Sequence, residues 1–449
     1  MHDLTRRGFL CGCSAAIAAL SGSRLNTVAY GDPGLNEEIL LVVFLRGGVD
    51  GLSLLPPIDG VDRGYYEAAR PTLQIPTTGP EAAIDLNGQF GLHPSMAPLY
   101  DLYQDGRIAI VQGTGMRDVV NHSHFDAMQY VELGTPGSKT TTTGWMTRHL
   151  QTAANLPSEI VMPSLAVGEL QPTSLLRSTE TVNLNNPDNF NFDNGPWVWR
   201  EAQRGVAREI YEASSSWLHD AGVQALDAID IVSENVTGAY TPANGAVYPD
   251  SELGDRLQVL AQMIKLDLGL QVATIDAGGW DTHEDQGEGG SGYLASLLSD
   301  LAAGLANFYL DLDGAGGGSY TGRLTVVVQS EFGRELQENA DQGTEHGYGN
   351  NIVVLSGNAI GGLHGAWPGL APGQLVEGTD VAVTTDYRRV LSEILIRRMG
   401  NPNIYQIFPG YADYQPLGIV EGTDLPPTGG GPAAIFNDGF ETGTLEAWS

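Results

Sequence analysis

The sequence predicts an α/β protein whose central, mostly parallel sheet is covered by helices on both faces. Continuous apolar runs at 39–45, 108–111, 270–275, 324–328 and 352–355 are typical of strands buried on both sides. Helical apolar spacing at 257–268 and a further expected helix at 292–312 precede two of these runs, and such alternation indicates a parallel sheet. Polar clusters adjoin several runs, at the strand ends where ligands bind in open α/β sheets.

The first expected strand, 39–45, is followed by Arg-Gly-Gly-Val-Asp-Gly at 46–51. Glycines at a strand end let the chain turn sharply and let a ligand approach the backbone. Asp50 is therefore a candidate metal ligand, and a helix or turn cap is its alternative role. The glycine pair is not a dinucleotide fingerprint, because no G-x-G-x-x-G follows.

A second strand-to-helix unit runs from 108–111 to Asn-His-Ser-His-Phe-Asp at 121–126. The spacing of Ala127, Met128 and Val131 predicts a helix that begins near Ser123. Backbone N–H groups and the dipole at a helix N-terminus favour an anion. Ser123 is thus a candidate nucleophile, and a simple helix cap is the alternative.

Residues 171–250 are rich in Asn, Ser, Thr and Pro around one expected helix at about 197–232. We interpret this stretch as an insertion that covers part of the site. No internal repeat and no transmembrane span occurs in the sequence.

Three polar clusters adjoin the later strands. Asp281 and His283 follow one strand, Glu331 and Arg334 follow the next, and His346 precedes the last. Carboxylates and imidazoles that converge at strand ends are suitable ligands for a divalent cation. A surface turn capped by Asp281 is the plain alternative, and Arg334 either pairs with an acidic neighbour or receives an anionic substrate.

The excess of acidic over basic residues limits the kinds of partner that the chain can bind. Lys and Arg number 22 against 54 Asp and Glu in 449 residues, a formal net charge of −32. Such a surface repels nucleic acid and anionic lipid, and it suits a secreted protein that must stay soluble. A hydrophobic content of 42% is enough for a substantial core.

The N-terminus indicates export. Thr-Arg-Arg-Gly-Phe-Leu at 5–10 precedes a short apolar stretch at 15–20, which is typical of a twin-arginine signal peptide. An ordinary export signal and lipidation at Cys13 are the alternatives. Cleavage after 27–29 would leave residues 30–449 and remove both cysteines, Cys11 and Cys13. We expect passage through the twin-arginine machinery to the periplasm or the outside of a Gram-negative bacterium.

Several motifs together resemble the DUF1501 family of exported bacterial proteins over about 39–399. They are Leu-Arg-Gly-Gly-Val-Asp-Gly at 45–51, Gly-Leu-His-Pro at 91–94, Asn-His-Ser-His-Phe at 121–125, Gly-Trp at 144–145, Gly-Trp-Asp-Thr-His at 279–283, Ser-Glu-Phe-Gly-Arg at 330–334 and Gly-Thr-Glu-His-Gly at 343–347. That family resembles the alkaline phosphatase and sulfatase superfamily. The resemblance implies a three-layer sandwich over 30–420, with a one-metal or two-metal site at the strand ends.

The resemblance also implies roles for individual residues. Asp281, His283 and His346 resemble ligands of a first metal, and Asp50 and Glu331 resemble ligands of a second. Ser123 resembles the nucleophile with His124 beside it as a catalytic residue, and the substrate-binding candidates are Asn121, His122 and Arg334. Phe332 and Asn351 stand where the superfamily often has histidine. Fewer nitrogen ligands would shift preference from zinc toward calcium, magnesium or manganese.

The sequence therefore predicts an exported, metal-dependent hydrolase of phosphate or sulfate esters, small molecules or glycans, in which Ser123 or a metal-bound water attacks. The alternative is a non-catalytic secreted or surface protein that binds anionic glycans or other ligands at a degenerate metal site. No sulfatase signature of the Cys-x-Pro-x-Arg type occurs in the chain. Residues 421–449 are expected to form a linker and a short tail.

Overall fold

The computed structural model describes residues 36–154, 162–187, 190, 197–236, 238–314 and 319–429. Residues 1–29, where the signal peptide is expected, with Cys11 and Cys13, and the end of the expected tail from 430 lie outside the described residues. No described helix is both long enough and apolar enough to cross a membrane.

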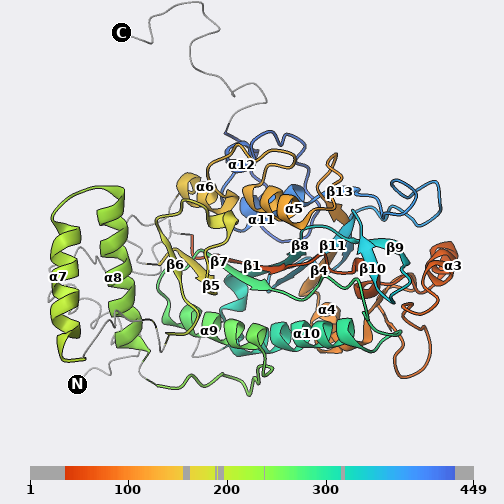
Figure 1. Ribbon diagram of the computed structural model, residues 1–449, viewed down its shortest axis with the longest axis horizontal. Helices are drawn as coiled ribbons and strands as arrows, with labels where there is room; N and C mark the ends of the chain where they lie inside the picture. Colours follow the sequence, from red (N-terminus) through yellow and green to blue (C-terminus); the bar gives the residue numbers. More distant parts are fainter. Residues whose placement is uncertain are drawn as a thin grey trace, which may run out of the picture.

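The strands form one large central sheet and two small ones (Figure 1). The strands are β1 (Ile39–Leu45), β2 (Ile84–Asp85), β3 (Gly91–Leu92), β4 (Ile108–Gly115), β5 (Ser164–Val167), β6 (Thr181–Asn183), β7 (Val272–Ala277), β8 (Leu324–Ser330), β9 (Arg334–Glu338), β10 (Thr344–His346), β11 (Asn350–Ser356), β12 (Gly362–His364) and β13 (Thr385–Asp386). The central order is β12-β4-β11-β8-β1-β7-β5-β6, with β13 also paired to β4. Only β11 runs antiparallel to its neighbours, which confirms the mostly parallel sheet.

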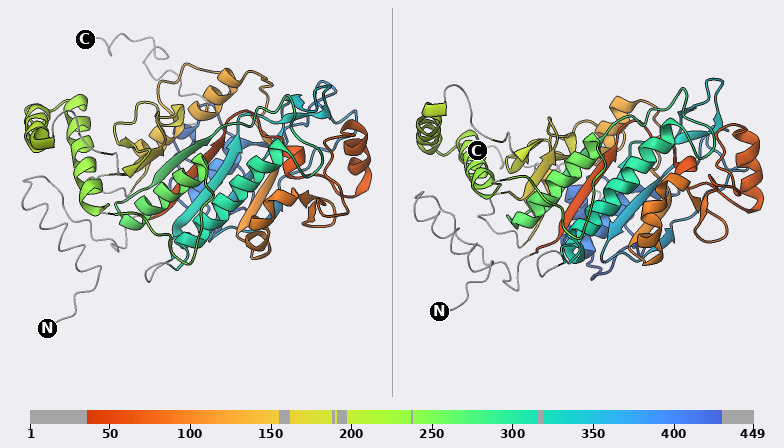
Figure 2. Two further views of the ribbon diagram at one scale, coloured as in Figure 1. Left: turned by 60° about the horizontal axis from the view of Figure 1, so that its bottom comes forward. Right: turned by 90° about the horizontal axis from the view of Figure 1, so that it is seen from below.

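Helices cover both faces of this sheet (Figures 1 and 2). The helices are α2 (Gly51–Leu54), α3 (Gly60–Ala69), α4 (Tyr100–Gln104), α5 (His124–Leu133), α6 (Trp145–Thr152), α7 (Arg200–Glu212), α8 (Trp217–Asn235), α9 (Glu252–Leu266), α10 (Tyr293–Leu312), α11 (Tyr387–Arg397) and α12 (Ile404–Ile407). Helices α9 and α10 lie against one face, and α5, α6, α11 and α12 cover the other. The expected three-layer α/β sandwich is confirmed.

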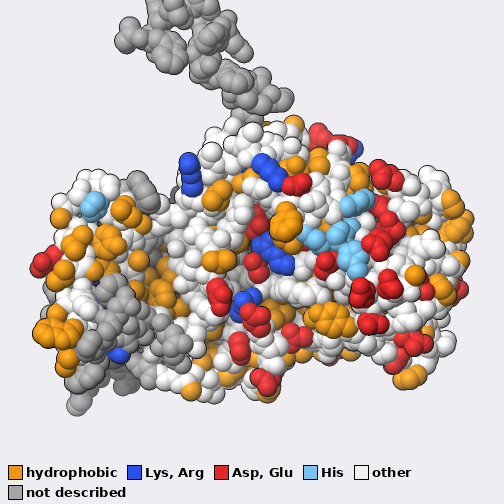
Figure 3. Space-filling model, viewed as in Figure 1, with side chains coloured by type: hydrophobic (Ala, Val, Ile, Leu, Met, Phe, Trp, Pro, Cys, Tyr) orange, Lys and Arg blue, Asp and Glu red, His pale blue; other side chains and the backbone are white. Residues whose placement is uncertain are grey.

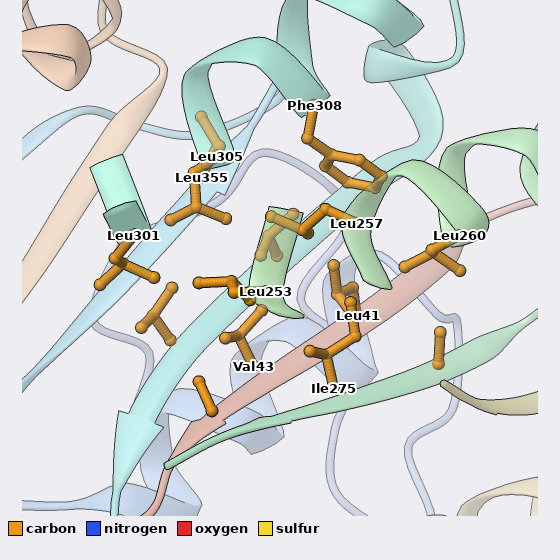
Figure 4. Packing of buried hydrophobic residues seen from close by; sticks show 14 of the residues in the cluster. Leu41, Val43, Leu253, Leu257, Leu260, Ile275, Leu301, Leu305, Phe308 and Leu355 are labelled. Carbon is orange, nitrogen blue, oxygen red and sulfur yellow. The ribbon is translucent and has the colours of Figure 1, made fainter. Parts of the chain in front are cut away.

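Strand β1 explains why the sheet needs both layers. Its alternate residues Leu41 and Val43 belong to the core beneath α9 and α10, whereas Leu40, Val42 and Phe44 belong to the core on the other face. Figure 4 shows Leu41 and Val43 beside the leucines of α9 and α10. Full burial of one such aliphatic side chain contributes about 1.5–3 kcal/mol, so a continuous apolar run favours the centre of a sandwich.

The stretch 171–250 differs from the expected insertion. It contributes β6 to the central sheet, and its one expected helix is two, α7 and α8, with a break at 213–216. The two helices pack against each other as a hairpin beyond the β6 edge, away from β9 and β10 (Figure 1). The hairpin therefore does not cover the strand ends discussed below.

The predicted clusters do meet at one edge of the sheet. β1, β7, β8 and β4 all point the same way, so their carboxyl ends lie together, and the antiparallel β11 begins at that edge. Segments 46–50, 278–283, 330–334, 116–124 and 344–350 consequently converge there. This geometry positions the candidate site.

Candidate metal centre

Three histidines and one aspartate converge at this edge. Ligand atoms of His124, Asp281 and His346 all lie within 4.8 Å of one another. His283 adjoins two members of this group, because its Nε2 lies 2.8 Å from Nε2 of His346 and 3.1 Å from Oδ1 of Asp281. We call His124, Asp281, His283 and His346 the ligand cluster.

The distances within the cluster fit a cation. Nε2 of His124 lies 3.3 Å from Oδ2 of Asp281, and Nε2 of His346 lies 3.1 Å from Oδ1 of Asp281. Tetrahedral zinc holds nitrogen and oxygen ligands at about 2.0–2.2 Å, so neighbouring ligand atoms are about 3.3 Å apart. Nε2 of His124 is also buried and has no hydrogen-bond partner.

The outer nitrogen of each imidazole is held by an acceptor. Nδ1 of His124 lies 2.8 Å from Oε1 of Glu331, Nδ1 of His283 lies 3.0 Å from Oε2 of Glu345, and Nδ1 of His346 lies 2.8 Å from the carbonyl oxygen of His122. Because carboxylates and carbonyls only accept, a proton on Nδ1 of each imidazole satisfies these three contacts. In that tautomer each Nε2 presents a lone pair to the centre, as in metal-bound histidines. Nε2 of His346 also lies at hydrogen-bond distance from Oδ1 of Asp281, 3.1 Å, so a cation would replace a proton at this contact.

Lone pairs and a carboxylate that face one another require a positive charge between them. The hydrogen bond to Glu331 raises the pKa of His124 despite burial, so a proton is favoured there when no cation is bound. Burial lowers the pKa of His346. Burial raises the pKa of Asp281, but the hydrogen bonds from Arg334 and His346 and the nearby charges of Arg334 and His124 together outweigh it, and the pKa falls to about 2. The cluster is thus a ready cation site, and a bound cation would displace the proton.

The cluster is open to solvent on one side. The side chain of Asp281 is 46% exposed and that of His283 is 33% exposed. Figure 3 shows histidine side chains gathered on this face beside acidic ones. A solvent-facing side is what separates catalytic metal sites from closed structural ones.

Two predicted ligands lie outside the cluster. Asp50 is fully buried, and its carboxylate accepts from Arg70 at 2.5 Å and from Gln286 at 2.8 Å. Glu331 is 1% exposed and accepts from Gly47 N–H and from His124. His124, expected beside the nucleophile, lies within the group that could hold a cation.

Arg334 is not placed to receive a substrate. Its guanidinium is buried and donates to Oδ1 of Asp281 at 2.6 Å, to the carbonyl of Gly48 at 2.6 Å and to that of Thr344 at 2.8 Å. It therefore anchors Asp281 and joins three of the converging segments. Of the two roles expected for Arg334, these contacts support pairing with an acidic neighbour.

The 121–123 loop is held by its own side chains. Oδ1 of Asn121 accepts from Ser123 N–H at 2.7 Å, and Nε2 of His122 lies 2.8 Å from Oδ2 of the buried Asp380. Asn121 and His122 therefore orient the chain that carries Ser123 and His124. Ser123 is the N-cap residue of α5, yet its side chain makes no capping hydrogen bond and it is exposed. The hydroxyl of Ser123 thus remains a candidate nucleophile.

Phe332 and Asn351 hold the places where the resemblance would have histidine. The buried ring of Phe332 lies with its centroid 4.9 Å from that of His124 and 4.8 Å from that of His346. Nδ2 of Asn351 donates to the carbonyl of Gly51 at 2.9 Å. Both side chains therefore have structural contacts, and the imidazole nitrogens of the cluster belong to His124, His283 and His346.

Close approach of two loops brings Asp281 to the centre. Gly47 has φ 128°, and a Cβ there would lie 2.4 Å from the backbone nitrogen of Asp281. Only glycine tolerates both the conformation and the contact. The Gly-Gly pair seen in the sequence thus serves loop packing against the Asp281 segment.

Part of the chain matches a known protein family. Residues 205–401 match the family described as "Protein of unknown function (DUF1501)". The DUF1501 resemblance is confirmed. The matched residues include Asp281, His283 and His346 of the ligand cluster together with Glu331.

Two solved structures are distantly similar to this chain. The PsFucS1 sulfatase from Pseudoalteromonas sp. has 11% identity and a TM-score of 0.32, with 88% of this chain and 71% of that chain covered. The lipoteichoic acid synthase LtaP from Listeria monocytogenes has 11% identity and a TM-score of 0.31, with 92% and 81% covered. No curated protein matches the chain. Similarity at this level carries no argument about activity.

Proposed function

We propose that this chain is an exported hydrolase of phosphate or sulfate esters that depends on one divalent cation at the ligand cluster. The observation that supports it best is the convergence of three bare Nε2 atoms on Asp281, each imidazole fixed by an acceptor on its other nitrogen. The donor set of three nitrogens and one oxygen suits zinc better than calcium or magnesium, which prefer oxygen. This reverses the shift toward oxygen-loving ions expected from the sequence.

The residues around the cluster support ester hydrolysis. A bound divalent cation supplies Lewis-acid polarisation of an ester oxygen and activation of the attacking group. Ser123 stands next to the ligand His124 at the start of the ten-residue α5, where N–H groups and the helix dipole stabilise negative charge on a substrate. The exposed side of Asp281 gives the substrate access.

The nucleophile is either the Ser123 hydroxyl or water, and one substitution separates them. Metal-loaded full chain and a Ser123→Ala variant should be assayed on aryl phosphates, phosphodiesters and aryl sulfates. Loss of turnover in the variant identifies Ser123, whereas retained turnover identifies water. Absence of turnover by the metal-loaded wild type on all three classes would favour the alternative, a secreted ligand-binding protein that uses the cation as a scaffold.

We further propose that the chain leaves the cytoplasm through the twin-arginine machinery, on the strength of the Arg6-Arg7 pair and the short apolar stretch at 15–20. Such export carries folded proteins, so the cation would be loaded first. Replacement of Arg6 and Arg7 by lysine should retain the precursor in the cytoplasm. Unchanged export would indicate the ordinary export route.

A further inference from the structure

The sequence leaves open whether one or two cations bind. The resemblance gives Asp50 and Glu331 to a second cation, next to the one held by Asp281, His283 and His346. In the structure both carboxylates have hydrogen-bond partners within the protein. These partners decide whether either carboxylate can also bind a second cation.

Asp50 already has a permanent cationic partner. Nη1 of Arg70 donates to its Oδ2 at 2.5 Å, and both side chains are 0% exposed. The same oxygen accepts from the Ser53 hydroxyl at 2.7 Å and from Nε2 of Gln286 at 2.8 Å. The other oxygen, Oδ1, accepts from the backbone N–H groups of Leu52 and Ser53. Neither oxygen is left for a metal.

Arg70 is fixed as firmly as its partner. Its Nε donates to the carbonyl of Leu336 at 2.8 Å, and its Nη2 donates to the carbonyl of Glu335 at 2.8 Å. Guanidinium remains charged at any ordinary pH and prefers such forked contacts. A divalent cation next to Asp50 would have to replace this charge and leave the buried guanidinium unpaired.

The Glu331 side of the expected second site is closed as well. Oε1 of Glu331 accepts from His124 and Gly47 N–H, and Oε2 lies 2.9 Å from the Ser330 hydroxyl, whose single proton is shared with the carbonyl of Leu45 at 2.6 Å. The adjacent Phe332 places a buried ring against the imidazoles of His124 and His346. Among the described residues, the single group of metal-ligating side chains is the one containing His124, Asp281 and His346.

We infer that the chain binds one divalent cation, at the ligand cluster, and that the guanidinium of Arg70 occupies the charge position of a second cation beside Asp50. This rests on the proposed function only in treating the cluster as a metal centre. Because the guanidinium of Arg70 is part of the chain and stays protonated, this positive charge cannot dissociate as a bound metal ion can. The site is thus mononuclear and differs from the two-metal arrangement that the resemblance allows.

The Asp50–Arg70 pair also reaches the ligand cluster through Gln286. While Nε2 of Gln286 donates to Asp50, its Oε1 accepts from the hydroxyl of Thr282 at 2.8 Å and from that of Thr344 at 3.1 Å. Thr282 lies between Asp281 and His283, and Thr344 is two residues before His346. The pair therefore positions the segments that carry three of the ligands.

The stoichiometry of bound metal tests this inference without any assay of turnover. The full chain, folded in the cytoplasm, is stripped with a chelator, loaded with excess zinc or manganese, passed through gel filtration at high salt and analysed for metal and protein. We expect one equivalent per chain. Two retained equivalents would overturn the inference, and none would overturn the cation site itself.

Variants show which residues hold the metal. The double variant Asp50→Asn/Arg70→Met, which removes both charges of the pair, should still bind one equivalent of metal. If the double variant does not fold, the milder Ser53→Ala replaces it and should also bind one equivalent. His283→Asn/His346→Asn should bind none. A fall from two equivalents to one in the double variant would assign Asp50 to a second cation. One retained cation without ester hydrolysis would contradict the proposed function and leave this inference standing.

Discussion

Nδ1 of His124 lies 2.8 Å from Oε1 of Glu331, and this contact turns the other nitrogen of His124 toward Asp281. Glu331 is buried at the end of β8, and the same oxygen accepts from Gly47 N–H. One carboxylate thereby orients the imidazole of a proposed metal ligand and ties the β1 loop to the β8 loop. Glu331 would act on a bound cation through His124.

Glu331→Gln should weaken metal binding without removing a ligand. Loss of a partner of this kind typically costs about 10–100-fold in metal affinity. Competition with a chromophoric zinc chelator measures the change. Because Glu345 holds His283 in the same way but is 53% exposed, Glu345→Gln is the matched control and should cost less. An equal or larger loss at Glu345 would contradict the importance assigned to Glu331.

Asp50→Asn should destabilise the fold far more than the double variant Asp50→Asn/Arg70→Met. Removal of one partner leaves the guanidinium of Arg70 buried and uncompensated, which costs about 3–5 kcal/mol, whereas replacement of a whole buried pair is often near neutral. Urea unfolding of the metal-free proteins gives the two free energies of unfolding. Similar losses in the single and double variants would show that the pair has no net coupling.

Gly47→Ala should displace the Asp281 loop and weaken metal binding. A Cβ at residue 47 would lie 2.4 Å from the backbone nitrogen of Asp281. Gly79 also has a positive φ, but a Cβ added there would have no atom within 4 Å. Gly79→Ala therefore carries the backbone strain alone and should retain full metal affinity. Isothermal titration with zinc separates the two, and equal affinities would contradict the role given to Gly47.

Two buried histidines away from the cluster predict loss of stability in mild acid. Burial lowers the pKa of His149 to about 4 and, against the charge of Asp50, that of His93 to about 4. The unfolded chain binds these protons near pH 6.5. Each residue therefore contributes stability above about pH 6.5 that is lost as the pH falls toward 4, on the order of 3 kcal/mol in full.

Urea unfolding at pH 7.5 and pH 5, with a chelator present, measures this loss. His149→Gln should reduce the difference in unfolding free energy between the two pH values, because glutamine does not titrate. An unchanged difference would show that protonation of His149 has no part in it.

The apolar runs predicted the core of the fold closely. The expected strand at 39–45 is β1 itself, the run at 324–328 lies within β8, and the run at 270–275 begins two residues before β7 and overlaps it. These strands are buried on both faces, so local composition alone identifies them. The hairpin of α7 and α8 was not anticipated as two helices, because the Ser-rich break at 213–216 is a weak signal within a helical pattern.

Residue types predicted the site better than they predicted individual roles. Asp281, His283 and His346 do converge, as expected from parallel strand ends. The placement of Glu331 behind His124, and of Arg70 against Asp50, depends on side-chain directions and on contacts distant in the sequence. Arg70 and Gln286 stand in no motif, so nothing local could have identified them.

Zinc K-edge X-ray absorption of the metal-loaded full chain tests the metal centre most directly. The structure predicts three imidazole nitrogens and one carboxylate oxygen at about 2.0–2.1 Å, with the imidazole contribution reduced in His124→Asn. A shell made of oxygen alone, or a spectrum that His124→Asn leaves unchanged, would contradict the ligand cluster of His124, Asp281, His283 and His346.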